Sequence, residues 1–268
     1  MAADVRELFR ARATDDGLAL CFEDERFTWR EHVQASLDRA AWLLAGRDPE
    51  RPFHVGVLLD NVPEFSFLLG AAAYAGATVV GINPTRRGAE LERDIGHTDC
   101  GVIVTEPKYL PDLDGLDLGA AQGRVFVAGS DDYAAALAPH AGAADPGLEL
   151  DPLSPYLLIF TSGTTGHPKA AICSQTRLAF IASNLVERFG LTPGEVVYCS
   201  MPMFHSNQLM AGWVPSLEAG ATLVLRRKFS ASGFLADVRK YGVTFMNYVG
   251  KPLTYILATP EAPDDGDN

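Results

Sequence analysis

The chain has 268 residues, of which 47% are hydrophobic and 21% are charged, a composition suited to a globular protein with a packed core. Its formal net charge of −12 argues against nucleic acid or an anionic membrane as a partner of the whole surface, although a local loop can still bind a small anion. No signal peptide is visible, and the scattered Cys21, Cys100, Cys173 and Cys199 predict free thiols in a reducing, cytoplasmic setting.

The first predicted elements are an amphipathic helix, Val5–Ala13, and a strand pair, Leu18–Phe22 with Arg26–Thr28. Thr28 and Glu31 form a capping-box pattern that begins a second helix. Apolar strands then alternate with helices, which is typical of βαβ units and of a mostly parallel sheet covered on both faces. The second helix is expected to run to about Leu44, followed by elements at Phe53–Leu59, Pro63–Ala75, Ala77–Ile82, Gly88–Gly96, Gly101–Thr105, Arg124–Val127 and Asp131–Leu137.

The uncharged stretch Phe65–Ile82 is long enough to suggest a transmembrane helix. It is, however, rich in Ala and Gly, and Gly76 lies in its middle, followed by β-branched residues. We therefore predict a buried helix, a turn at Gly76 and a buried strand, and no transmembrane segment. Peripheral contact with a membrane surface stays open at this point.

The segment 138–151 is rich in Ala, Gly, Pro and Asp, and it is predicted to be a linker between two α/β regions, 1–137 and 152–259. An acidic tail, 260–268, follows the second region. The expected fold class is α/β, with layered, mostly parallel sheets and helices on both faces. Elements of the second region are predicted at Tyr156–Phe160, Ala170–Cys173, Ser174–Phe189, Val196–Ser200, Gln208–Leu217, Ala221–Leu225, Gly233–Tyr241, Val243–Tyr248 and Pro252–Ala258.

The segment Ile159–Ala170, IFTSGTTGHPKA, has the composition of a phosphate-binding loop. Its glycines allow tight turns, consecutive backbone N–H groups can form an anion-binding concavity, and its lysine supplies a mobile positive charge. A Walker A loop is excluded because GxxxxGK[ST] is absent and the following residues are strand-like. The alternative is an ordinary surface hairpin. The candidate phosphate-binding residues are Thr161, Ser162, Gly163, Thr164, Thr165, Gly166 and Lys169.

The string SGTTGHPK resembles the signature loop of the adenylate-forming (AMP-binding) superfamily, which includes acyl-CoA synthetases, firefly luciferase and the adenylation domains of peptide synthetases. A second segment, Ser200–Leu225, resembles the family's next motif, an aromatic–His pair before an apolar helix. A third, Asn247–Leu257, resembles the fatty-acid-transport and very-long-chain acyl-CoA synthetase branch. Val57–Asn83 and the NPTRRGAEL that follows match the same branch. The resemblance covers nearly the whole chain and implies the large N-terminal domain of such an enzyme.

This resemblance implies a fatty-acyl-CoA ligase, an AMP-forming acid–thiol ligase that uses ATP, Mg²⁺ and CoA. Family features that normally lie farther along the chain are not found, including the magnesium-binding Glu, the ribose-binding Asp and the small C-terminal domain with its catalytic Lys. The chain is therefore expected to be a truncated, N-terminal portion. Neither its cysteines nor its histidines have ligand spacing, so no metal site is predicted here, and the main Mg²⁺ ligand is expected in the missing part.

By the same resemblance, Lys169 and His205 are the candidate catalytic residues. The substrate pocket is predicted to involve Phe204, His205, Trp213, Tyr248 and Gly250. Core packing is the alternative role for Trp213, and a structural hydrogen bond is the alternative for His205.

Two other functions are compatible with the sequence. One is a catalytically incomplete fragment that binds nucleotide weakly or acts as an interaction module. The other is an adenylating enzyme that serves a carrier protein in place of CoA. A sheet that is cut short would leave a strand edge uncovered, so association through that edge is also expected.

Overall fold

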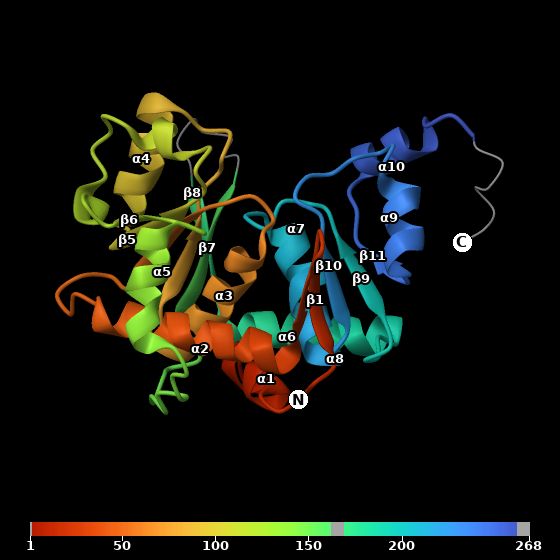
Figure 1. The fold of residues 1–268 in the computed structure, drawn as a ribbon, viewed down its shortest axis with the longest axis horizontal. Coiled ribbons are helices and arrows are strands. Elements are labelled where there is room, and N and C mark those ends of the chain that lie inside the picture. The colour runs from red at the N-terminus through yellow and green to blue at the C-terminus, as the bar shows by residue number, and fades with distance from the viewer. Residues whose placement is uncertain (1, 162–168, 262–268) are drawn as a thin grey trace.

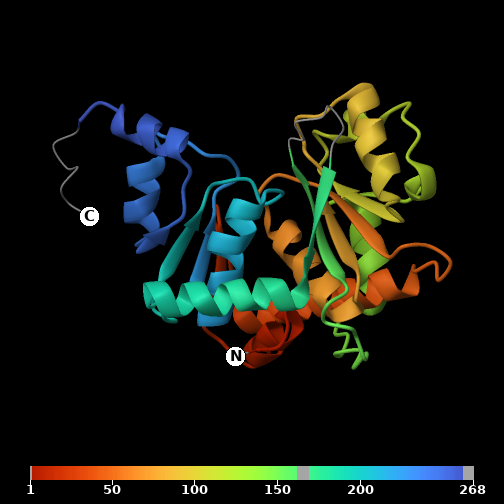
Figure 2. The same cartoon turned by 180° about the vertical axis from the view of Figure 1, so that it is seen from behind.

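The computed structural model describes residues 2–161 and 169–261, and it forms two β-sheets that lie side by side (Figures 1 and 2). One sheet has six strands in the order β6-β5-β3-β4-β7-β8, and the other has five in the order β11-β9-β10-β1-β2. Helices α1 (Val5–Arg12), α2 (Trp29–Ala45) and α6 (Gln175–Phe189) run across one end of both sheets. The expected α/β architecture of layered, mostly parallel sheets is confirmed.

The six-stranded sheet is parallel except for its last strand, β8, which runs antiparallel to β7. Its central strands are buried except for His54 at the start of β3, in keeping with apolar runs that are covered by helices on both faces. The segment 162–168 connects β7 to β8, as expected for a loop between two strands. The strands are β3 (His54–Leu58), β4 (Thr78–Gly81), β5 (Val102–Thr105), β6 (Val125–Val127), β7 (Pro155–Thr161) and β8 (Lys169–Ser174).

The five-stranded sheet is parallel except for β2, which forms a hairpin with β1. Glu23 lies in the hairpin turn with a positive φ of 52°, a conformation that few side-chain-bearing residues adopt. At the opposite edge, β11 pairs with β9 over only two residues. The strands are β1 (Leu18–Phe22), β2 (Glu25–Thr28), β9 (Val196–Cys199), β10 (Thr222–Leu225) and β11 (Phe245–Met246).

The helices begin and end where the sequence signals lie. Thr28 and Glu31 form the expected capping box at the start of α2, and Ser174 caps α6. Gly76 and Gly242 end their helices in the left-handed conformation that suits glycine. The remaining α-helices are α3 (Pro63–Ala75), α4 (Gly88–Thr98), α5 (Asp131–Leu137), α7 (Ser206–Gln208), α8 (Val214–Ala219), α9 (Phe234–Tyr241) and α10 (Gly250–Leu257).

Helix α3 accounts for the apolar stretch that resembled a membrane span. All of its residues except Glu64 are buried, and β4 follows after the turn at Gly76, as predicted. In the part of the chain that the structure describes, no helix has the length and apolar character that crossing a membrane requires.

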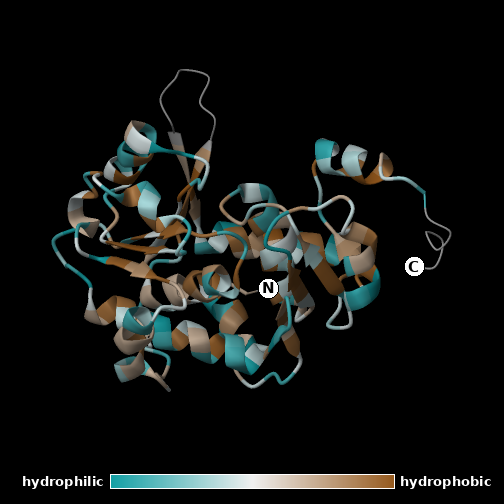
Figure 3. Cartoon of the chain, turned by 45° about the horizontal axis from the view of Figure 1, so that its top comes forward, coloured by the Kyte–Doolittle hydropathy of each residue, from teal (hydrophilic) through white to brown (hydrophobic). Residues whose placement is uncertain are grey.

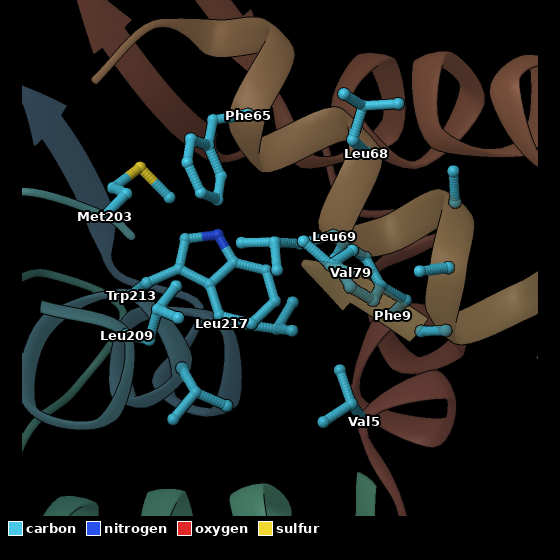
Figure 4. Packing of buried hydrophobic residues seen from close by; sticks show 14 of the residues in the cluster. Val5, Phe9, Phe65, Leu68, Leu69, Val79, Met203, Leu209, Trp213 and Leu217 are labelled. Carbon is cyan, nitrogen blue, oxygen red and sulfur yellow. The ribbon is translucent and has the colours of Figure 1, made fainter. Parts of the chain in front are cut away.

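Trp213 lies in the core between the two sheets, with Phe65, Met203, Leu209 and Leu217 around its indole (Figure 4). Its indole N–H donates a hydrogen bond to Ser66 Oγ at 2.7 Å, so the polar end of this large side chain is satisfied as well. Figure 3 shows that the strands are mostly hydrophobic, whereas hydrophilic residues are concentrated on the outer helices and loops. The core therefore runs continuously from one sheet to the other.

Two features differ from the sequence expectation. The helix predicted over Gln208–Leu217 is interrupted by a π-helical turn, Leu209–Trp213. The strand predicted over Val243–Tyr248 is reduced to β11. The predicted regions 1–137 and 152–259 do not coincide with the sheets, because β7 and β8 join the first sheet while β1 and β2 join the second. The division into domains stays a prediction.

Candidate functional site

A cavity of about 620 Å³ opens where the carboxyl ends of parallel strands from both sheets meet. Ligands in open α/β proteins bind at this end of the strands, in the crevice beyond them. The six-stranded sheet contributes the segments that follow β3, β4 and β5, and the five-stranded sheet contributes those that follow β9 and β10. The lining combines apolar and charged side chains, among them Leu59, Pro84, Phe204, Phe229, Asp60, Arg87, Arg227 and Lys228.

One wall of the cavity is a network of charged side chains that connects the two sheets. Asp60 accepts hydrogen bonds from Lys108 and from the hydroxyl of Tyr109. Glu106 accepts from the Asp60 backbone N–H at 2.7 Å and forms an ion pair with Arg227, which follows β10 in the other sheet. Burial and the bond to Asp60 raise the pKa of Tyr109, so its hydroxyl stays protonated and keeps donating. The network therefore fixes the strand ends relative to one another.

Phe204 lines the cavity, and His205 follows it in the loop after β9 but is not itself one of the lining residues. Their ring centroids are 4.2 Å apart, and the backbone N–H of His205 donates to Pro202 O at 3.1 Å. Although the imidazole reaches solvent, the protein atoms around it limit hydration, and this desolvation lowers the pKa of His205. A largely neutral imidazole at neutral pH can accept or donate one hydrogen bond to a bound group.

Glycine at position 81 lets Phe204 approach the end of β4. A Cβ atom on Gly81 would lie 3.1 Å from Phe204 Cβ and 3.2 Å from Phe204 Cα, which is closer than an ordinary contact. Behind Phe204 a narrow apolar space lies between the sheets and is lined by Phe65, Ile159 and Leu209 among others. Phe204 thus separates the open cavity from an apolar interior.

The predicted phosphate loop joins β7 to β8 in the six-stranded sheet. Ser162, Gly163, Thr164, Thr165 and Gly166 lie outside the described residues. Thr161 ends β7 and Lys169 begins β8, where the two backbones are paired in register. Because β7 runs parallel to β4, its carboxyl end lies at the same edge of the sheet as the cavity.

Comparison with known proteins identifies the chain. The AMP-binding enzyme family matches residues 9–267. The chain belongs to this family. It is 51% identical over 260 residues to the steroid-22-oyl-CoA synthetase of Rhodococcus jostii, covering 96% of this chain and 46% of that protein. It is 44% identical to the medium/long-chain-fatty-acid–CoA ligase FadD17 of Mycobacterium marinum, covering 100% of this chain and 52% of that protein.

Solved structures of lower identity have the same fold as this chain. The N-terminal domain of FACL13 from Mycobacterium tuberculosis superposes with a TM-score of 0.86 at 22% identity, covering 100% of this chain and 67% of that one. ATP-bound MatB from Rhodopseudomonas palustris superposes with a TM-score of 0.83 at 23% identity, covering 97% of this chain and 52% of that one. The chain spans about half the length of the curated relatives it matches. The expected resemblance to the N-terminal part of fatty-acyl-CoA synthetases is confirmed.

The other predicted pocket residues of this chain are separated in the structure. Trp213 is 3% exposed and belongs to the core, the alternative role considered from the sequence. Tyr248 and Gly250 lie at the start of α10 and are exposed. Their connection to the cavity region is indirect, through Asn247, whose side chain accepts a hydrogen bond from Gln208 at 3.2 Å.

Gln175, the first residue of α6, has a structural role here. Its side chain is buried, accepts a hydrogen bond from the Arg6 backbone N–H and donates to Ala73 O, both at 3.1 Å. It therefore ties α6 to α1 and α3 at the end of the molecule where these helices cross.

Sequence reasoning missed the charged and amide residues that follow the strands. Asp60 and Asn61 come directly after β3, Glu106 follows β5, and Arg227 follows β10. Their positions after apolar strands are the signal that could have found them, since the ends of parallel strands meet at one edge.

Within residues 2–161 and 169–261, no group of three or more His, Cys, Asp or Glu side chains is placed to hold a metal ion. The nearby carboxylates of Asp60 and Glu106 are already paired with cations. These residues therefore do not fit the Mg²⁺ that the family implies, and no step is assigned to it here.

Proposed function

We propose that this chain is the N-terminal part of an AMP-forming ligase that joins a hydrophobic carboxylic acid, of the fatty-acyl or steroid-acyl type, to CoA. The observation that carries the proposal is its similarity, over nearly all of its length, to CoA ligases that act on such acids. The cavity at the strand ends, with its apolar and cationic lining, supports an acid with a large apolar part.

The reaction has two steps. A carboxylate oxygen attacks the α-phosphorus of ATP, the bond to the pyrophosphate oxygen breaks, and acyl-AMP and pyrophosphate result. The sulfur of CoA then attacks the acyl carbonyl carbon, and AMP leaves as the thioester forms, with the thiol proton passing to solvent or a base. A carboxylate is already a nucleophile, so the protein mainly positions the groups and neutralises phosphate charge.

Residues of this chain would act in the first step. The segment from Thr161 to Gly166, with Lys169, would bind the β- and γ-phosphates through N–H groups, hydroxyls and the ammonium. Phe204 and His205 would hold the carboxylate at the mouth of the cavity, with the imidazole as a hydrogen-bond donor. The buried free thiols of all four cysteines support a reducing compartment such as the cytoplasm.

The test is ATP–pyrophosphate exchange with a panel of fatty and steroid acids. The chain is assayed alone and joined to the part of the Rhodococcus jostii relative that lies beyond the matched segment, with that whole relative as the positive control. We expect exchange from the joined enzyme, and its loss in Lys169→Ala and His205→Ala. His97→Ala, at an exposed histidine of α4, is the matched control.

The panel also separates the alternatives. If exchange occurs but the thioester forms only with a carrier protein, the acceptor is that carrier protein and not CoA. A joined enzyme that binds ATP without any exchange, while the relative is active, would mean that this chain is a catalytically incomplete homologue. Exchange by the chain alone would show that the first step needs no further residues.

A further inference from the structure

The loop that carries Phe204 and His205 has little regular structure of its own. It runs from Ser200 to His205 between β9 and α7, and three of its residues, Ser200, Met201 and Met203, are buried. Buried backbone N–H and C=O groups need hydrogen-bond partners, and an irregular loop cannot supply them within itself. The partners of these groups therefore decide where the loop lies.

A single side chain from the other sheet supplies two of them, one at Met201 and one at Met203. Asn61 Nδ2 donates to Met201 O at 2.8 Å and to Arg226 O at 3.1 Å, and its Oδ1 accepts from the Met203 N–H at 2.8 Å. These bonds use both donors of the amide and its carbonyl oxygen, and the side chain is 3% exposed. Asn61 thus connects the end of β3 with the segments after β9 and β10.

The position of Asn61 is itself well defined. It lies between Asp60, which is held by the charged network described above, and Pro63, which begins α3. The Val62 N–H donates to Asp60 O at 2.9 Å and closes a tight turn around Asn61. Within the loop's own segment, Gln208 accepts from the Met201 N–H at 3.0 Å. The other bonds of Gln208 go to Cys199 of β9 and to Asn247, so Gln208 does not connect the loop to the six-stranded sheet.

We infer that Asn61 is a positioning residue that holds the Phe204–His205 loop against the cavity by joining the ends of the two sheets. The catalytic meaning of this placement rests on the proposed function, whereas the placement itself can be tested without activity. Without the amide, Met201 O and the Met203 N–H would be buried and unpaired, and the loop would have to move toward water. Phe204 would then leave its contact with Gly81, and His205 would become better hydrated.

The first test uses NMR on the 268-residue chain with Asn61→Leu, which keeps a similar side-chain volume and removes the hydrogen bonds. The matched control is Gln175→Leu, which removes another buried amide with two backbone partners far from this loop. We expect faster amide hydrogen exchange at Met203 and an upward shift of the His205 pKa toward its ordinary value in Asn61→Leu only. The His205 signal is assigned with His205→Gln.

Equal changes in both variants, or no change at His205 in Asn61→Leu, would overturn the inference. If Asn61→Leu does not fold, Asn61→Gln carries the test, because it keeps the amide and displaces it by one methylene. For Asn61→Gln, too, we expect faster amide exchange at Met203 and an upward shift of the His205 pKa, and no change at His205 would overturn the inference.

The joined enzyme gives a second readout. We expect Asn61→Leu to lower kcat for exchange by roughly 10- to 100-fold while the KM for ATP changes little, since a small misplacement of a positioning group acts mainly on the reacting geometry. Gln175→Leu is expected to retain kcat, and an equal loss there would overturn the inference. A joined enzyme without exchange would contradict the proposed function, and the NMR comparison would still decide the placement by Asn61.

Discussion

Acid should destabilise this protein through one buried histidine. His32 is 2% exposed, its Nε2 lies 2.7 Å from Ser66 Oγ, and the rings of Phe9, Trp29 and Phe67 surround it. Burial, helped by the positive charge of Arg39, lowers the pKa of His32 from 6.5 to about 3. In the folded protein the imidazole is therefore neutral over the whole mildly acidic range.

The sign of the effect follows from proton binding. The unfolded chain binds a proton at this histidine below its ordinary pKa of 6.5, whereas the folded chain binds one only below about pH 3. The contribution of His32 to stability is therefore fully present above pH 6.5 and is lost as the pH falls from 6.5 toward 3. Two pH units below the ordinary value, at about 1.36 kcal/mol per unit, the loss is about 2.7 kcal/mol. That is a large share of the roughly 5–15 kcal/mol by which a domain is stable.

The assay is urea unfolding followed by circular dichroism at about pH 7.5 and about pH 4.5, for the wild type, His32→Gln and the exposed-site control His97→Gln. The wild type and His97→Gln should lose about 2.7 kcal/mol more between the two pH values than His32→Gln does. Asp94, whose pKa burial raises, titrates alike in the wild type and in His32→Gln, so it cancels in that comparison. Equal losses in all three would refute the assignment of this acid sensitivity to His32.

Two further predictions concern the cavity edge and the surface. Gly81→Ala should cost about 1–3 kcal/mol of stability and move Phe204, because the new methyl group meets the Phe204 backbone. Gly96→Ala, in open space on α4, should instead stabilise the protein by about 0.4–1 kcal/mol. Urea unfolding of the two variants measures both effects. Tyr255 and Leu257 on α10 are 57% and 77% exposed, so the chain should associate as its concentration rises, and replacing both by Ser should weaken this in sedimentation velocity. A wild-type sedimentation coefficient that does not depend on concentration would contradict the second prediction.

Local signals in the sequence were sufficient for most elements. Pro at the start and Gly76 after the end bound α3 at the predicted residues, and the capping box begins α2 where it was expected. Alternating apolar strands and helices gave the parallel sheets, because that pattern reflects burial on both faces. These features depend on residues close together in the chain, which is why they can be read without a structure.

The features that were missed depend on residues far apart in the chain. The π-helical turn contains Gly212, where a Cβ atom would lie 2.1 Å from Gln208 Nε2 and 2.7 Å from Asn247 Oδ1, so packing against the side chain of Asn247, far along the chain, shapes this turn. Asn247 also donates to Asn207 at 2.8 Å, and β11 ends at the residue before it. Neither contact has a signature in the local sequence.

The candidate site itself shows the same division. The phosphate-loop string and the Phe204–His205 pair stand out in the sequence, yet one belongs to the six-stranded sheet and the other follows a strand of the five-stranded sheet. For both to act on one substrate, the two sheets must keep a fixed relation at their carboxyl ends. Asp60 and Asn61 provide it, through Glu106 and Arg227 on one side and the loop before Phe204 on the other. Asp60 and Asn61, the pair after β3 that connects the two motifs, therefore have no distinctive local sequence. Their role depends on which strands lie next to each other in the fold.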